Sequence, residues 1–117
     1  MEREEMKRRT KQFALRIIKL CNSLPKDKTS DVIRGQLIRA GTSVGSNYRA
    51  ACRAKSNADF LYKLKIVEEE ADESLYWMEL LIEAELVEQN RLLDLMEEGD
   101  EIIALVVSSI KTARKNK

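Results

Sequence analysis

Five basic side chains between residues 32 and 58 form the group in this chain best suited to contact an anion, because no acidic residue interrupts that stretch. They are Arg34, Arg39, Arg49, Arg53 and Lys55. An arginine guanidinium matches the geometry of a phosphate through paired hydrogen bonds. We therefore predict that this segment contacts the phosphodiester backbone of a nucleic acid. A second protein helix is an alternative partner for the same face, and a solvated surface is the simplest alternative.

The acidic side chains are concentrated in the other half of the chain. Residues 1–58 carry 14 Lys and Arg against 5 Asp and Glu, whereas residues 59–117 carry 7 against 15. The formal net charge of +1 therefore conceals two halves of +9 and −8. One surface can meet an anion, and another can meet a basic neighbour or the basic half of a second copy. A further basic cluster near the N-terminus adds to the first surface; it consists of Lys7, Arg8, Arg9 and Lys11.

The side chains that most enzymatic chemistry needs are missing from the sequence. The chain has no histidine, which excludes Ser–His and Cys–His nucleophile pairs. The carboxylates of residues 68–73 point in many directions around a helix, which predicts a solvated acidic surface and no metal site. Phosphate-loop, dinucleotide, zinc-finger and helix-turn-helix signatures are also absent. We predict no catalytic residue, no cofactor and no small-molecule substrate; an enzyme that uses carboxylates alone is the remaining alternative.

Hydrophobic spacing predicts the elements that position these side chains. Apolar residues recur at helical spacing in four segments, and no segment alternates as a strand would. We predict an all-α fold, a single domain over residues 1–117, built as an antiparallel up-down four-helix bundle. The helices are expected at residues 3–24, 29–55, 57–86 and 91–114. Pro25 ends the first helix, and the second begins at an N-cap among residues 29–31.

The same spacing predicts which face of each helix is buried. On the second helix Arg39, Arg49 and Arg53 lie opposite the apolar stripe, and Arg34 lies at its flank. On the fourth helix the predicted stripe consists of Leu92, Met96, Gly99, Ile103, Val107 and Ile110.

The third helix has a second apolar ridge outside its core stripe. The ridge consists of Tyr62, Ile66, Trp77 and Leu80, with Tyr76 beside them and with Glu69 and Glu73 in its gap. A bundle helix needs only one apolar face, so a second face that carries Trp and Tyr predicts a subunit interface. Glu69 and Glu73 would then accept the outer arginines of a neighbouring subunit. A lone exposed aromatic patch is the alternative interpretation.

The sequence contains no segment that predicts insertion into a membrane. The longest apolar run, residues 102–107, is far shorter than a membrane span. The first dozen residues are charged throughout, unlike a secretory signal. We expect a cytoplasmic protein with no membrane partner.

Two stretches resemble a known family. They are GTSVGSNYRAACRAKSNADF at residues 41–60 and EEEADESLYWMELL at residues 68–81, and the segments SLP at 23–25 and QLIRAGTS from residue 36 fit the same pattern. The chain resembles the four-helix-bundle family encoded in intervening sequences of 23S ribosomal RNA genes. The match in the second and third helices is specific, whereas that in the first and fourth is mostly apolar pattern.

The resemblance implies a bacterial cytoplasmic four-helix bundle. The family is similar to the accessory protein of diversity-generating retroelements, a five-fold ring whose basic surface binds nucleic acid and a reverse transcriptase. The resemblance therefore implies a homopentamer, RNA or DNA as a ligand with RNA favoured, and a reverse transcriptase as a candidate partner. It carries over no catalytic residues.

Two functional hypotheses follow. In the first, the protein is a non-enzymatic, ring-forming nucleic-acid-binding protein that neutralises phosphates through its basic helix face. In the second, it is a protein-interaction scaffold whose basic and acidic faces pair between subunits, without nucleic-acid binding. Contacts of Glu69 and Glu73 with arginines across a subunit boundary would favour the second hypothesis.

Overall fold

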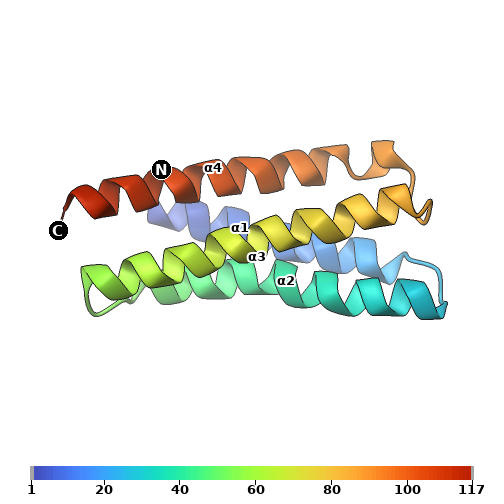
Figure 1. Ribbon diagram of the computed structural model, residues 1–117, viewed down its shortest axis with the longest axis horizontal. Coiled ribbons are helices and arrows are strands. Elements are labelled where there is room, and N and C mark those ends of the chain that lie inside the picture. The colour runs from blue at the N-terminus through green and yellow to red at the C-terminus, as the bar shows by residue number, and fades with distance from the viewer. Residues whose placement is uncertain (1, 117) are drawn as a thin grey trace.

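The computed structural model describes residues 2–116, which form four α-helices joined by short connections (Figure 1). The helices are α1 (Arg3–Asn22), α2 (Lys28–Cys52), α3 (Asn57–Glu83) and α4 (Leu93–Lys115), and a single 3-10 turn, η1 (Gln89–Arg91), precedes α4. Successive helices run antiparallel along one long axis, and the molecule measures 48 × 22 × 20 Å. The predicted all-α up-down four-helix bundle is confirmed.

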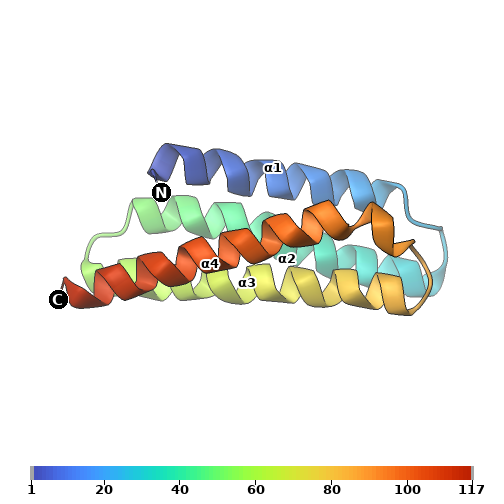
Figure 2. The same ribbon diagram turned by 90° about the horizontal axis from the view of Figure 1, so that it is seen from above.

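The bundle is not closed equally on all sides. α2 packs along both α1 and α3, and α4 packs along α3, whereas α1 and α4 meet over a short stretch and diverge toward the two chain termini (Figure 2). The side chain of Arg9 on α1 bridges this stretch by contacting Glu98 and Glu101 of α4. The divergence leaves a wedge between α1 and α4 at the end of the bundle where α1 begins and α4 ends.

The predicted buried stripe of α4 is right at Leu92, Gly99 and Ile110 but wrong at Met96, Ile103 and Val107. Ile102 and Val106 are fully buried, whereas Ile103 and Val107 are half-buried. Residues 102–107 are all apolar, so periodicity alone cannot fix which of them face inward. Packing decides instead, because Gly99 lies so close to Leu75 of α3 that a Cβ there would be 2.9 Å from its side chain.

Local hydrogen bonds move several helix ends away from their predicted places. The N-cap of α2 is Asp27, whose carboxylate accepts the backbone N–H of Ser30 at 2.8 Å, so the cap predicted among residues 29–31 is wrong. α1 ends at Asn22 and not at residue 24, and α2 ends at Cys52 and not at residue 55. α3 begins where expected, with Ser56 as its N-cap.

The end of α3 is a left-handed turn, which stops the helix at Glu83 rather than at the predicted residue 86. Glu85 has φ of 61°, and the N–H of Leu86 donates to the carbonyl of Leu81 at 2.9 Å. This is the Schellman arrangement, in which glycine usually occupies the left-handed position. A glutamate there is strained, because its Cβ is crowded in that conformation.

Candidate nucleic-acid interface

Arg34 holds the α1–α2 turn together and is not free to bind a ligand. Its guanidinium donates to the carbonyl oxygens of Cys21, Leu24 and Pro25 at 3.0, 3.2 and 2.9 Å. It is also ion-paired with Asp31, one turn earlier in α2. These bonds occupy carbonyl groups at the end of α1 and in the turn that follows it. The expectation that Arg34 contacts nucleic acid is therefore corrected to a structural role.

Arg39 is ion-paired within the chain, although its side chain is half-exposed. Its guanidinium meets Glu70 of α3 at 3.1 Å and also pairs with Glu73. Glu73 accepts a further hydrogen bond from the indole N–H of Trp77 at 2.9 Å. The arginine partner of Glu73 therefore comes from the same chain, whereas the sequence suggested a neighbouring subunit. Among residues 2–116, Glu69 has no ion-pair partner.

The other three predicted basic residues converge at a groove between α2 and α3. Arg49, Arg53 and Lys55 are exposed, and none of them pairs with a carboxylate of residues 2–116. The groove is lined by Ser46, Arg49, Ala50, Arg53, Lys55, Asp59 and Lys63. Its carboxylate, Asp59, is held by the Lys63 ammonium at 2.8 Å, which lowers the pKa of Asp59. The groove thus presents an excess of positive charge.

A second shallow groove, between α1 and α2, adjoins the first. It is lined by Lys7, Thr10, Lys11, Ala14, Thr42, Gly45, Ser46 and Arg49. Gly45 lets the two helices approach closely, because a Cβ at this position would lie 3.3 Å from the Thr10 hydroxyl. Ser46 and Arg49 line both grooves, so cations from three helices follow one another across the surface. We call the cations Lys11, Arg49, Arg53, Lys55 and Lys63 the basic track.

The N-terminal basic cluster contributes less to this surface than its composition suggests. Arg8 is ion-paired with Glu5, and Lys7 is paired with Glu4 at 3.1 Å. Arg9 is turned toward α4, where Glu98 raises its pKa further through hydrogen bonding. Lys11 remains without an ion-pair partner among the described residues. Lys63, by contrast, was not predicted from the sequence as part of the basic surface. Its position one helical turn after Asp59, on the side of α3 that faces α2, is the sequence feature that could have indicated it.

Folding converts the separation of charge along the sequence into a separation along the bundle axis. One end carries the α2–α3 loop, the start of α1 and the end of α4 (Figure 1). The segments in that half, residues 2–12, 42–66 and 106–116, have 13 Lys and Arg against 4 Asp and Glu. The segments in the other half, residues 13–41 and 67–105, have 7 against 16. We call these halves the basic end and the acidic end; the basic track lies on the basic end.

The predicted apolar ridge of α3 is partly used inside the molecule. Tyr62 and Tyr76 are 66% and 52% exposed. Trp77 and Leu80 pack at the margin of the core, and the rings of Tyr76 and Trp77 meet edge to face with centroids 5.1 Å apart. Ile66 is half-buried. The part of the ridge that faces outward is therefore its tyrosines, more than its tryptophan.

Two further features of residues 2–116 bear on other classes of function. None of the helices within residues 2–116 is both long enough and apolar enough to cross a membrane. In the same part of the chain, no three His, Cys, Asp or Glu side chains come together as metal ligands would.

Comparison with known proteins gives two matches that agree. The family described as "23S rRNA-intervening sequence protein" matches residues 2–108. A crystal structure from Bacteroides thetaiotaomicron VPI-5482, described as a protein with unknown function from the S23 ribosomal protein family, is similar with a TM-score of 0.88 and 38% sequence identity. That match covers 95% of this chain and 99% of the Bacteroides chain. No curated protein matches the chain.

Proposed function

The chain belongs to the 23S rRNA-intervening sequence protein family, and from this premise we propose that it binds nucleic acid, with RNA favoured, through the basic track. The observation that carries the proposal is the position of Arg49, which lines two adjoining grooves whose other charged residues are almost all cations. The proposed ligand is a phosphodiester chain that lies across α1, α2 and α3.

Recognition in this proposal is electrostatic. Guanidinium and ammonium groups neutralise successive phosphates, and the release of condensed counterions drives association. Ser46, a small residue that lines both grooves, allows a strand to come close to the helix surface. No aromatic side chain lines either groove, so base stacking does not contribute there. Such a site distinguishes sequences poorly, because phosphate contacts position a strand without reading its bases.

We also propose that the protein acts by binding and not by catalysis, and that it assembles as a homo-oligomer. The resemblance implies a pentamer, in which repeated tracks would strengthen a weak single site through avidity. The exposed tyrosines of α3 supply the proposed contact between subunits. Bacterial cytoplasm is the proposed compartment, again on the strength of the family.

The scaffold hypothesis is the weaker alternative. It requires the acidic residues of α3 to accept arginines of a neighbouring subunit. Glu73 already pairs with Arg39 within one chain, which occupies one of the two predicted acceptors and leaves only Glu69. Arg49 and Arg53, by contrast, remain open to a ligand.

Fluorescence anisotropy with a labelled single-stranded RNA and a labelled duplex DNA, at one low ionic strength, tests this proposal. The informative variant is Arg49→Ala/Arg53→Ala/Lys55→Ala. Its matched control is Arg16→Ala/Lys19→Ala/Lys26→Ala, which removes the same charge from exposed positions outside the basic track. We expect the first variant to lose most of the affinity and the control to retain it. An equal loss of affinity in both variants would show that only the net charge of the protein matters, and it would contradict the proposed site.

A further inference from the structure

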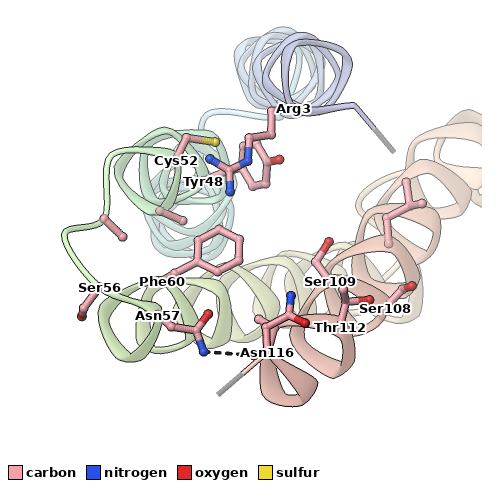
Figure 3. Close-up of a pocket in the computed structure, with 14 residues that line it drawn as sticks. Arg3, Tyr48, Cys52, Ser56, Asn57, Phe60, Ser108, Ser109, Thr112 and Asn116 are labelled. Carbon is pink, nitrogen blue, oxygen red and sulfur yellow. Dashed lines mark hydrogen bonds between the residues drawn. The ribbon is translucent and has the colours of Figure 1, made fainter.

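A cavity of about 550 Å³ opens at the basic end, in the wedge where α1 and α4 diverge (Figure 3). It lies on the other side of the α2–α3 loop from the basic track. Arg53 and Lys55 of that loop line the α2–α3 groove, whereas Ala54 and Ser56 line the cavity. Its volume falls in the range of about 300–1,000 Å³ that small-molecule sites occupy.

One wall of the cavity is aromatic and carries a cation. The Arg3 guanidinium lies over the Phe60 ring with its Cζ 5.1 Å from the ring centroid, and it reaches into the cavity beside Tyr48 (Figure 3). Arg3 is exposed and has no ion-pair partner among residues 2–116. Burial, together with the neighbouring Cys52, raises the pKa of Tyr48 to about 12, so its phenol stays neutral at physiological pH.

The opposite wall, on α4, is rich in hydrogen-bonding groups. Ser108, Ser109, Thr112 and Asn116 line it (Figure 3). The amide of Asn57 is fixed below them, because it donates to the carbonyl of Ala113 at 3.0 Å. Among residues 2–116, no Asp or Glu lines the cavity. Within that part of the chain, a ligand meets one cation, the Phe60 ring, the edge of the buried Tyr48 and several hydroxyl groups.

We propose that this cavity binds a ribonucleoside monophosphate unit. The Arg3 guanidinium moves off the Phe60 ring to pair with the phosphate, the planar base takes its place against Phe60, and the hydroxyl groups of α4 bond the ribose or the edge of the base. The unit is either a free nucleotide or the 5′-phosphorylated end of a strand, since both present the same chemistry. The site is distinct from the basic track and does not rest on the function proposed for it.

Isothermal titration calorimetry with AMP, UMP, adenosine and inorganic phosphate as separate probes tests the site. Arg3→Ala should weaken AMP binding by at least about tenfold, because it removes a charge-assisted contact with the phosphate. Ser109→Trp should abolish binding by filling the cavity from the exposed surface of α4. The matched control is Arg16→Ala, an exposed arginine of α1 that does not line the cavity, and it should bind AMP as the wild type does.

Competition with RNA identifies the source of the nucleotide. Displacement of AMP by a 5′-phosphorylated RNA, but not by its 5′-hydroxyl counterpart, would support a strand end; displacement by neither would support a free nucleotide. The proposal is overturned if the wild type binds no nucleotide at millimolar concentration, if Arg3→Ala binds AMP unchanged, or if phosphate binds as tightly as AMP. Arg49→Ala/Arg53→Ala/Lys55→Ala should lose RNA affinity while it keeps AMP binding, which separates failure of this site from failure of the basic track.

Discussion

Arg39 of α2 and Glu73 of α3 are ion-paired within one chain, and the same Glu73 carboxylate accepts the Trp77 indole N–H at 2.9 Å. The pair joins one residue of the predicted basic face to one residue of the predicted subunit interface. It therefore removes Arg39 from the set of cations open to a ligand and leaves Arg49, Arg53 and Lys55 to carry that role.

The fluorescence of Trp77, the single tryptophan, should report the protonation of Glu73. The Trp77 hydrogen bond and then the contact with Arg39 lower the pKa of Glu73, so the emission change should occur below the usual glutamate value of about 4.3. Because the folded-state pKa is the lower one, these contacts stabilise the fold above pH 4.3, and that stability is lost as the pH falls through the lowered value. A pH titration of Trp77 emission measures the midpoint.

Arg39→Gln should move that midpoint upward, because it removes one cause of the lowered pKa. Arg49→Gln makes the same change of charge without contacting Glu73 and should leave the midpoint in place. Far-UV circular dichroism at each pH separates local protonation from unfolding. Identical midpoints in Arg39→Gln and the wild type would show that the ion pair does not form in solution.

Arg9 should contribute to stability more than a typical surface arginine does. Its side chain is 16% exposed, and it donates to both Glu98 oxygens at 2.9 and 2.6 Å, where it bridges α1 and α4. Arg9→Met should lower the free energy of unfolding by about 1–3 kcal/mol, because a part-buried charged hydrogen-bond network is lost. Urea denaturation measures the change.

The matched comparison for Arg9 is Arg8→Met, since Arg8 lies next to it and pairs with Glu5 at the exposed surface. An exposed pair of this kind contributes little, so the change should stay within about 0.5 kcal/mol. If Arg9→Met and Arg8→Met lowered the free energy of unfolding equally, the contacts of Arg9 with Glu98 and Glu101 would not stabilise the packing of α1 on α4.

Glu85→Gly should stabilise the protein, which is unusual for a substitution to glycine. Glu85 has φ of 61°, a conformation in which its Cβ is crowded. Removing the Cβ stabilises the fold by more free energy than the larger loss of backbone entropy of glycine costs. We expect a gain of about 0.5–1 kcal/mol in chemical denaturation. Glu83→Gly, two residues earlier and inside α3, should instead destabilise. A loss of stability in Glu85→Gly would mean that α3 does not end in this turn.

The exposed tyrosines of α3 should decide the oligomeric state. Tyr62→Glu/Tyr76→Glu places charges on the outward part of the ridge; it removes the edge-to-face contact of Tyr76 with Trp77 but keeps Glu73, the acceptor of the Trp77 indole N–H. Light scattering coupled to size-exclusion chromatography should show a smaller mass than for the wild type. Leu15→Glu alters another exposed apolar side chain, on α1, and should leave the mass unchanged. A wild-type mass in the tyrosine variant would refute the α3 interface.

Helical periodicity was enough to predict the number and direction of the helices, since Pro25 and the polar breaks separate four amphipathic segments. The buried face of α4 was not predictable in the same way. Ile102 and Ile103 are equally apolar, and the close packing of Gly99 on α3 selects between them. Such a choice depends on contacts between helices, which a single helical wheel does not contain.

The residues of the candidate site were also predictable only in part, because contacts between helices decide which of them are exposed to a ligand. The sequence indicated a basic surface, but it could not separate the arginines that have internal partners from those that have none. Arg34 bonds carbonyl groups at and just after the end of α1, 9 to 13 residues away in sequence, and Arg39 pairs with carboxylates of α3. Lys63 joins the surface for the opposite reason, because the packing of α3 on α2 brings it beside Arg53 in one groove.

The most direct test of the basic track is the salt dependence of RNA affinity. For a single strand, the plot of log K against log salt falls by about 0.7 for each phosphate that a cation neutralises. Lys63 already pairs with Asp59, so the four other cations of the basic track predict a slope of about −2.8, and Arg49→Ala/Arg53→Ala/Lys55→Ala should bring it to about −0.7. The control Arg16→Ala/Lys19→Ala/Lys26→Ala should keep the wild-type slope. A flat plot for the wild type, or the same slope in both triple variants, would contradict phosphate recognition by the basic track.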